Sequence, residues 1–395
     1  DHYRDPINDS VVLSGISGYL NILDIPTYSK EVALLGYRIA GEIAPEALNV
    51  AFGEVHFDFE LPGSTHNFRL SDPFFCSIQH SDKHVHSGSG SLEILMDRMV
   101  RGDQCKLFYK PFYCRDEFSD ERYSPVFTPT AYSGQTVRMK LYLDQWNGWE
   151  TVGIAPYVRT MSNKKDHLQG YIKLVQEQWL DVEFTIPDTE GDLVDEVGIV
   201  IEGYAPGKSK TLGMIYLDSF SITGKSKYTI AIQKQKSEFG TITPFAVDHG
   251  AWAKEEGKLS LMSCEPSFAY AGNYYSKNYT VSTTITPLNG DSHLVLARAQ
   301  GAMRGYAFGL TKDNTVALYK NHFGWQPLAT AGFNWQLGQT YPVSITVKGS
   351  SIQCSINGTV LAEVQDDTYE YGMFGCGALG IGRAYYGDFA VTEIE

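Results

Sequence analysis

Residues 341–364 have the sequence YPVSITVKGSSIQCSINGTVLAEV, in which apolar and polar side chains alternate. Val343, Ile345 and Val347 lie at every second position, and the same period continues through residues 352–356. A two-residue period with one apolar face is typical of a half-buried β-strand. The segment therefore predicts consecutive antiparallel strands.

Two turn sequences divide this segment into three strands. Gly-Ser at 349–350 and Asn-Gly at 357–358 separate the alternating runs, and Asn-Gly best tolerates the positive φ angles of a type I′ turn. We expect Val360 and Val364 to continue the buried face. A three-stranded meander cannot bury its apolar face alone, so it predicts a second layer of strands. Its polar face is too uniform to be a binding site, and we expect it to be a scaffold; it carries Ser344, Thr346, Ser351, Gln353 and Ser355.

Composition narrows the possible partners. The chain has 395 residues, enough for roughly two to three domains. Its 25 Tyr, 6 Trp and 38 Gly suit strands, tight turns and surfaces that stack on flat ligands. The formal charge is −14 and the basic residues are scattered, which argues against nucleic acid or an anionic membrane surface as a partner. No apolar run reaches the ~18 residues of a membrane span. Because the chain begins with Asp1 and not with Met, we expect a processed product, an engineered chain or a fragment.

Residues 1–50 differ from the rest of the chain. Val32, Leu35, Ile39 and Ile43 follow one another at spacings of three and four, which is the period of an amphipathic helix. We expect this helical segment to be the end of a preceding helical domain or a brace between β domains.

The remaining sequence predicts a mainly β protein. Strand patterns recur through 51–224 and 225–395 without intervening helix patterns, as in the alternating runs at 137–143 and 180–186. We therefore expect two antiparallel β-sandwich domains of the jelly-roll or concanavalin-like type, with these limits.

The first predicted sandwich ends in a familiar pattern. Residues 213–224, GMIYLDSFSITG, resemble the closing strand of jelly-roll carbohydrate-binding modules, an apolar strand interrupted by an Asp. The resemblance implies that Asp218 ligates a structural calcium, with Glu54, Asp58 and Glu60 as available partners from the N-terminal strand. Carboxylate oxygens suit calcium. The alternative is that Asp218 caps a turn or faces solvent.

A predicted hairpin in the second sandwich gathers polar side chains. With a three-residue loop at 301–303, Gln300 lies opposite Arg304 and Arg298 opposite Tyr306, all on one face. Two guanidinium groups, an amide and a phenol on a rigid sheet can hydrogen-bond the hydroxyls or a carboxylate of a sugar. The alternative is that these are ordinary solvent-facing residues or a contact with another domain.

Aromatic residues complete the predicted ligand sites. Tyr274 and Trp325 are expected beside the polar hairpin face, where a sugar ring could rest on them. In the first sandwich, Trp146 and Trp149 lie in the polar loop DQWNGWE and are candidates for stacking. The alternative for these two is that they fold back over the sandwich edge.

Catalytic and metal motifs are sparse. Asp82, His84 and His86 alternate, as metal ligands on one strand would, but no further ligand accompanies them. The chain has no G-x-S-x-G, P-loop or HExxH motif. A glycosidase needs two carboxylates facing one another, and strand acids such as Glu93 and Glu183 are isolated in the sequence.

The C-terminal segments YAGNYYSKNYTVSTTITP, RAQGAMRGYAFGL, ALYKN and VSITVKGSSIQCSINGTVL carry a second resemblance. Residues 245–395 resemble the laminin-G-like, concanavalin-type sandwich at the C-terminal end of some large bacterial proteins of the ADP-ribosylglycohydrolase family. Residues 18–55 look like the last helices of that family's catalytic domain. The family's metal-binding motifs do not occur in this chain, so the resemblance implies that any di-magnesium hydrolase activity lies upstream. No catalytic residue is carried over.

We therefore expect a non-catalytic, carbohydrate-binding accessory region of a larger glycan- or ADP-ribose-processing protein. Structural calcium and an upstream catalytic domain would be its cofactor and partner. Two other hypotheses are a complete glycoside hydrolase with a site between the sandwiches, and a structural module for domain packing or dimerisation.

Overall fold

The computed structural model describes residues 54–66, 68–71, 76–99, 102–110, 131–145, 151–203, 211–238 and 241–395. The predicted N-terminal helical segment, Trp146 and Trp149 lie outside these residues. The regular secondary structure of the described chain is strand, apart from one 3-10 turn, η2 (Ile232–Lys234). Every pairing between its named strands is antiparallel, so the predicted fold class is confirmed. Among the same residues no helix is long and apolar enough to cross a membrane.

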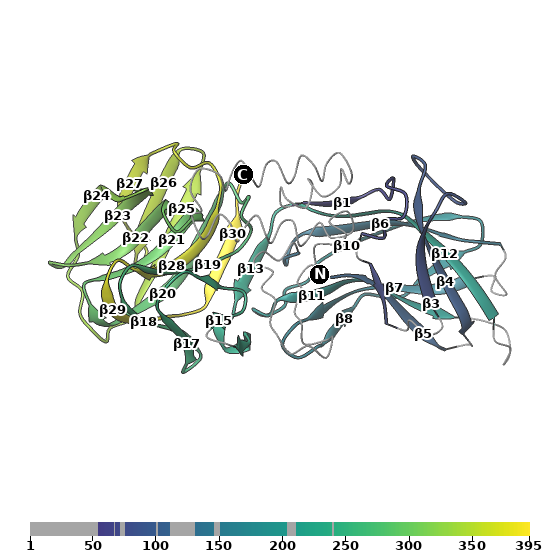
Figure 1. Ribbon diagram of the computed structural model, residues 1–395, viewed down its shortest axis with the longest axis horizontal. Coiled ribbons are helices and arrows are strands. Elements are labelled where there is room, and N and C mark those ends of the chain that lie inside the picture. Colours follow the sequence, from purple (N-terminus) through teal and green to yellow (C-terminus); the bar gives the residue numbers. More distant parts are fainter. Residues whose placement is uncertain are drawn as a thin grey trace.

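Two six-stranded sheets form the first sandwich, drawn in purple and teal in Figure 1. Sheet A has the order β10-β6-β12-β4-β3, with β1 paired to β12. Its strands are β1 (Val55–Phe57), β3 (Cys76–Ser81), β4 (Ser91–Met99), β6 (Thr136–Leu143), β10 (Trp179–Thr185) and β12 (Thr211–Thr223). Sheet B has the order β2-β5-β11-β7-β8, with β9 paired to β7. Its strands are β2 (Arg69–Leu70), β5 (Gln104–Tyr109), β7 (Thr151–Thr160), β8 (Asp166–Leu168), β9 (Ile172–Val175) and β11 (Val194–Gly203).

The core of the first sandwich follows from the alternation in these strands. Val137, Met139 and Leu141 of β6 are buried together with Val182 and Phe184 of β10. Each such side chain contributes about 1.5–3 kcal/mol when it leaves water. The intervening residues of both strands consequently lie on the outer face of sheet A.

The second sandwich, in green and yellow in Figure 1, packs a nine-stranded sheet against a seven-stranded one. Sheet C has the order β17-β18-β29-β20-β25-β26-β27, with β30 paired to β20 and to β13. Its strands are β13 (Lys227–Ile230), β17 (Ala251–Glu255), β18 (Lys258–Cys264), β20 (Tyr279–Gly290), β25 (Tyr341–Lys348), β26 (Ser351–Ile356), β27 (Thr359–Gln365), β29 (Ile381–Tyr386) and β30 (Phe389–Glu393). Sheet D has the order β16-β19-β28-β21-β22-β23-β24. Its strands are β16 (Ala246–Val247), β19 (Ser267–Ala271), β21 (Ser292–Gly301), β22 (Arg304–Thr311), β23 (Thr315–His322), β24 (Trp325–Gly332) and β28 (Met373–Ala378). A small hairpin, β14 (Ser237–Glu238) and β15 (Thr241–Ile242), precedes them.

The predicted meander is present as β25, β26 and β27. Its apolar positions from 343 to 356 are buried, and Asn357 and Gly358 both have positive φ, as a type I′ turn requires. One detail of the prediction is wrong. Val360 is 47% exposed, because a register shift between Cys354 and Ser355 turns it outward and places Ala362 in the core instead.

The two sandwiches meet through a short connection, visible between them in Figure 1. The ring of Tyr132 stacks on that of Tyr228, with centroids 4.2 Å apart. The Ala231 amide donates to the Gly191 carbonyl at 2.9 Å. Gly191 has φ +85°, and a Cβ there would lie 2.4 Å from the Cβ of Ala231, so the position requires glycine on both counts.

The two large hydrophobic cores take their residues from 55–222 and from 230–391. The limits 51–224 and 225–395 stay our proposal for the domain boundaries.

Candidate functional site

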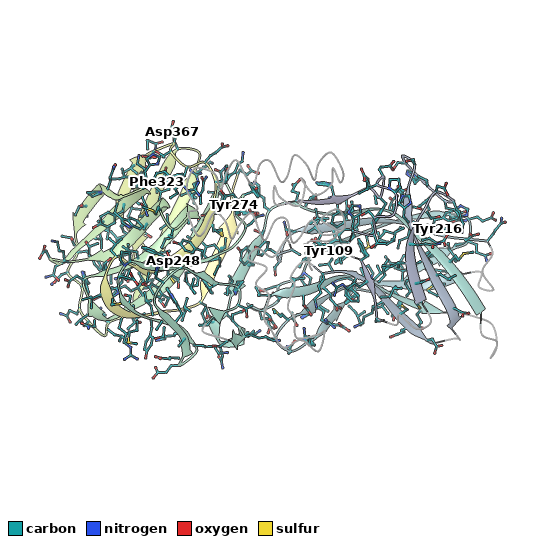
Figure 2. All side chains as sticks on the ribbon, in the orientation of Figure 1. Tyr109, Tyr216, Asp248, Tyr274, Phe323 and Asp367 are labelled. Atoms are coloured by element: carbon teal, nitrogen blue, oxygen red, sulfur yellow. The ribbon has the colours of Figure 1, made fainter. Side chains whose placement is uncertain are left out.

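A row of five residues crosses the outer face of sheet A, one from each of its five main strands. The strand registers pair Gln79 with Glu93, Glu93 with Tyr216, Tyr216 with Tyr142, and Tyr142 with Trp179. Directly paired residues on neighbouring strands point to the same face of a sheet. We call these five residues the sheet A row. Figure 2 shows its central member, Tyr216, in the part of the first sandwich remote from the second.

Glu93 anchors the polar end of the row. Its side chain is 3% exposed and accepts hydrogen bonds from the Gln79 amide at 2.7 Å, from Lys83 at 2.8 Å and from the Tyr216 hydroxyl at 2.9 Å. Burial raises the pKa of Glu93, but the hydrogen bonds from Lys83, Tyr216 and Gln79 outweigh it, so the pKa lies below its ordinary value. Glu93 is therefore a fixed anion that orients Tyr216.

Aromatic rings form the other end of the row. The Tyr142 and Trp179 rings have centroids 5.1 Å apart. His84 stacks on Tyr142 at 4.6 Å and lies edge-on to Tyr216 at 4.8 Å. Its Nε2 lies 3.2 Å from a carboxylate oxygen of buried Asp144. Tyr142, Trp179 and His84 stay half-buried, so parts of their rings are open to solvent.

The loop that carries His84 is held down by Asp218. The Asp218 carboxylate accepts hydrogen bonds from the backbone N–H of His86 at 2.7 Å and from the hydroxyl of Ser87 at 3.0 Å. Asp218 is therefore a buried loop anchor, because its side chain fixes the turn that places His84 over the row.

The predicted calcium ligand set is not assembled. Asp58 accepts the N–H of Glu60, Glu54 lies 3.1 Å from His56, and neither joins Asp218. No group of three or more His, Cys, Asp or Glu residues in the described ranges could hold a metal ion. The alternating residues Asp82, His84 and His86 likewise do not form such a group. The predicted grouping of ligands is therefore wrong, because Asp218 accepts hydrogen bonds from the His86 N–H and the Ser87 hydroxyl instead, while the structural calcium itself stays a prediction.

The predicted ligand face around Arg298 is wrong as well. Arg298 is 0% exposed and has φ +48°. Its guanidinium donates to the carbonyl oxygens of Lys277 at 2.7 Å, Gly349 at 2.7 Å and Tyr369 at 3.0 Å. These acceptors belong to three separate connections, so Arg298 joins them and its described donors are not presented to a ligand.

Its predicted neighbours are also occupied within the protein. Tyr306 is buried and donates to Asp366 at 2.6 Å, and buried Gln300 donates to the carbonyl of Tyr371 at 2.9 Å. Arg304 donates back to the carbonyl of Gln300 at 2.8 Å. Tyr274 is buried between other tyrosine rings.

The error lies in the register of the hairpin. Ala297, and not Arg298, pairs with Tyr306, because a bulge between Ala297 and Gly301 shifts one strand against the other. A one-residue slip moves every side chain of that strand to the other face. Tyr306 consequently points into the core with Ala297.

Trp325 lies on the outer face of sheet D. Its ring centroid is 5.3 Å from that of Phe268, although β19 and β24 are five strand steps apart in the sheet. Five steps would span roughly 24 Å on a flat sheet. This outer face is therefore strongly concave, and its own aromatic side chains meet across it.

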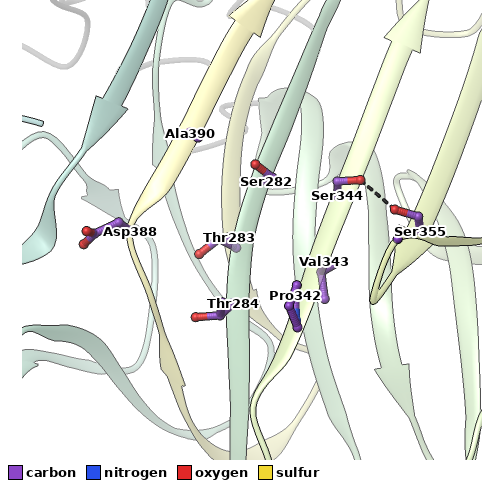
Figure 3. Close-up of a pocket in the computed structure, with 10 residues that line it drawn as sticks. Ser282, Thr283, Thr284, Pro342, Val343, Ser344, Ser355, Asp388 and Ala390 are labelled. Atoms are coloured by element: carbon purple, nitrogen blue, oxygen red, sulfur yellow. Dashed lines mark hydrogen bonds between the residues drawn. The ribbon is translucent and has the colours of Figure 1, made fainter. Parts of the chain in front are cut away.

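The structure places a hollow on the outer face of sheet C (Figure 3). It has a volume of about 340 Å³. The face that we expected to be only a scaffold lines it, through Ser344 and Ser355, so that expectation needs correction. We call it the sheet C hollow; its lining residues are Ser282, Thr283, Thr284, Pro342, Val343, Ser344, Ser355, Gly358, Asp388 and Ala390.

Sequence reasoning missed the sheet A row, although a signal was available. Tyr142 and Trp179 occupy the polar positions of strands whose alternate residues are apolar. A large aromatic residue on the solvent side of an alternating strand is a candidate contact residue. The third member, Tyr216, and its link to Glu93 depend on the order of the strands, which no local pattern reveals.

No family model matches this chain, and no curated protein matches it. Among solved structures, carbohydrate binding module CBM66 from Bacillus subtilis is similar at 16% identity and a TM-score of 0.35, over 38% of this chain and 95% of the module. A protein of unknown function with a galectin-like fold from Bacillus subtilis is similar at 15% identity and a TM-score of 0.34, over 43% and 98%. The N-terminal CBM22-1-CBM22-2 tandem domain of Paenibacillus barcinonensis Xyn10C is similar at 11% identity and a TM-score of 0.28, over 86% and 97%.

Proposed function

We propose that this chain binds carbohydrate through the sheet A row. The observation that supports the proposal is the register-aligned series from Gln79 to Trp179, which places half-open aromatic rings beside fixed polar groups on a rigid sheet. Sugar rings present C–H patches that rest on aromatic faces and hydroxyls that bond carboxylates and amides. The row offers both kinds of contact along one line, through the half-buried rings of Tyr142 and Trp179 and the exposed amide of Gln79.

The charge at the row favours a neutral ligand. Glu93 and Asp144 are buried carboxylates next to Tyr216 and His84, and Asp181 lies on the adjacent outward position of β10, 2.8 Å from Lys140. An anionic ligand would meet these negative charges in a partly desolvated place. A neutral oligosaccharide avoids that cost and keeps the stacking.

The geometry of the row argues against acid–base catalysis there. A glycosidase acid must carry a proton near neutral pH, whereas the hydrogen bonds to Glu93 keep its pKa low. The row therefore suits binding. A complete hydrolase with a site between the sandwiches and a purely structural module stay as the alternatives.

The wider context is a further part of the proposal. An accessory role beside an upstream catalytic domain, the resemblance to the C-terminal region of ADP-ribosylglycohydrolase-family proteins, and a structural calcium all stay predictions. The sequence encoded upstream of Asp1 tests the first two, and calorimetric titration with calcium tests the third.

Native gel electrophoresis in soluble xylan, β-glucan, arabinan and levan tests the binding proposal. We expect retardation by at least one polysaccharide, followed by calorimetry with its oligosaccharide. Trp179→Ala should weaken binding by about two- to tenfold, since an aromatic contact contributes about 0.5–1.5 kcal/mol. Tyr142→Ala should have a similar effect, because its ring lies between Trp179 and Tyr216.

Tyr171→Ala is the matched control. Tyr171 is 46% exposed and precedes β9 of sheet B, so it belongs to the same sandwich but not to the row. It should leave affinity within twofold. Equal affinity for the wild type, Trp179→Ala and Tyr142→Ala would sink the proposal, provided that circular dichroism shows all three folded.

A further inference from the structure

We infer that the sheet C hollow is a second binding site, for a small neutral polyhydroxylated ligand such as a monosaccharide. It lies in the other sandwich and shares no residue with the sheet A row. Its chemistry is different, since hydroxyl groups and short apolar side chains line it and no aromatic ring does. The inference thus goes beyond the proposed function and does not depend on it.

The outward hydroxyls of β20 show where unused hydrogen-bonding capacity lies. Thr280 is bonded to Thr346 at 2.8 Å, and Thr286 is bonded to Thr340 at 2.8 Å. Between them, within the described part of the chain, the hydroxyl of Ser282 has no hydrogen-bond partner. The same is true of the hydroxyl of Thr284.

The hydroxyls of Ser282 and Thr284 lack partners because of the residue that lies opposite each of them on β25. Ser282 pairs across the strands with Ser344, but the Ser344 hydroxyl turns away to Ser355 at 2.8 Å (Figure 3). Thr284 pairs with Pro342, which offers no side-chain partner. Neighbouring hydroxyl pairs are thus closed on each other, while the hydroxyls of Ser282 and Thr284 stay available to a ligand.

A bulge shapes the same place. The register against β20 shows that Thr283 and Thr284 face three residues: Gly387 and Asp388, which connect β29 to β30, and Phe389, the first residue of β30. Such a bulge bends a strand and redirects its side chains. Gly387 suits this bulge, since a Cβ there would lie 2.3 Å from the Thr284 Oγ1 and would displace that hydroxyl. The bulge also places Asp388 at the edge of the hollow, where its carboxylate accepts the Ile232 N–H at 2.8 Å.

These features select the ligand class. The available hydroxyls both donate and accept, which matches the hydroxyls of a sugar. Pro342 and Ala390 give a small apolar surface for its C–H groups. The Asp388 carboxylate and the net charge of −14 disfavour an anion. A volume of about 340 Å³ is at the lower end of small-molecule sites, so the ligand is small.

Amide chemical shifts of the full 395-residue chain test the inference. The probes are D-glucose, D-galactose, D-xylose, D-fructose and L-arabinose, each titrated to high millimolar concentration. We expect at least one to shift the amide signals of Ser282, Thr284 and Ser344 with a saturating curve. Ser282→Ala with Thr284→Val should weaken that binding at least fivefold, because it removes the two available hydroxyls, and Ser282→Phe, which fills the hollow, should abolish it.

The matched control removes a hydroxyl pair outside the hollow. Thr280→Val with Thr346→Val acts on the same face of the same sheet and should change affinity less than twofold. Trp179→Ala should leave the shifts at the hollow unchanged, so failure of one site does not hide the other. No saturable shifts with any of the five sugars, or equal effects of the two double variants, would overturn the inference.

Discussion

Sheet A and sheet C both have an outer face made of antiparallel strands, but the two faces have different chemistry. On sheet A, aromatic rings and a buried carboxylate follow one line across five strands. On sheet C, serine and threonine hydroxyls pair with one another, and two hydroxyls, those of Ser282 and Thr284, have no partner among the described residues. Stacking adds about 0.5–1.5 kcal/mol per aromatic contact, whereas a net hydrogen bond in water adds about 1 kcal/mol or less. We therefore expect tighter binding at sheet A than at sheet C.

The comparison also separates two uses of a buried charge. Glu93 accepts side-chain donors and fixes a residue of the candidate site, Tyr216. Arg298 donates to main-chain carbonyls and fixes connections at the end of the second sandwich. A charged side chain therefore marks a ligand site only when the groups that it holds face the ligand.

Arg298→Met should have the largest effect and sharpens this distinction. It leaves the carbonyls of Lys277, Gly349 and Tyr369 without their donor in a buried place, so the free energy of unfolding should fall by about 3–5 kcal/mol. Urea denaturation followed by tryptophan fluorescence measures it. Polysaccharide retardation in native gels should be unchanged, because the sheet A row is in the other sandwich.

The opposite pattern would restore the original interpretation of Arg298. A loss of stability below 1 kcal/mol together with a loss of sugar binding would show that Arg298 contacts ligand.

Glu93→Gln should have an intermediate effect that depends on pH. The folded pKa of Glu93 is lowered, so its contribution is fully present above the unfolded value of about 4.5 and is lost as the pH falls through the folded value. At pH 7 the variant should lose about 1–3 kcal/mol of unfolding free energy. The difference from wild type should shrink below about pH 4.5 in urea denaturation series.

Glu183→Gln is the control for this charge. Glu183 is on the same sheet and bonds Arg138 at 2.9 Å, but both side chains are more than half exposed, so its removal should change stability by less than about 0.5 kcal/mol. A Glu93→Gln effect that stays constant from pH 7 to pH 3 would contradict the assignment of Glu93 as a fixed anion.

Val360→Thr should have the smallest effect and tests the outer face of sheet C. Val360 is exposed and pairs with Ser355 of the hollow. Threonine keeps the branched shape, so the unfolding free energy should change by less than about 0.5 kcal/mol. Thermal denaturation measures it. A loss above 1.5 kcal/mol would mean that Val360 is in the core, as the sequence pattern predicts.

Local patterns predicted the fold well, because each strand needs only its own alternation to show which face is buried. Residues 341–364 and the alternating runs at 137–143 and 180–186 formed strands with the expected burial at most positions. The failures came where inserted residues change the register. The bulges at Ala297–Gly301 and at Cys354–Ser355 moved Tyr306 inward and Val360 outward.

The candidate sites depend on strand order, and this explains why they were not predicted. Tyr142, Tyr216 and Glu93 become neighbours only because β12 lies between β6 and β4. Within the described residues, the Thr284 hydroxyl stays without a partner because β25 places Pro342 opposite it. Asp218 stands in a strand whose pattern resembles a calcium-binding one, but the loop that folds over sheet A brings main-chain N–H groups to its carboxylate first.

The connection between the sandwiches affects how the chain would engage a polymer. The Tyr132–Tyr228 stack and the close approach of Gly191 to Ala231 join the two sandwiches by direct contacts. A flexible linker would let two modules search many separations, whereas this connection gives a high effective concentration only for glycan segments of matching length and direction. The avidity would then depend on the architecture of the polysaccharide, such as the spacing of its exposed chain ends, as much as on the identity of its sugars.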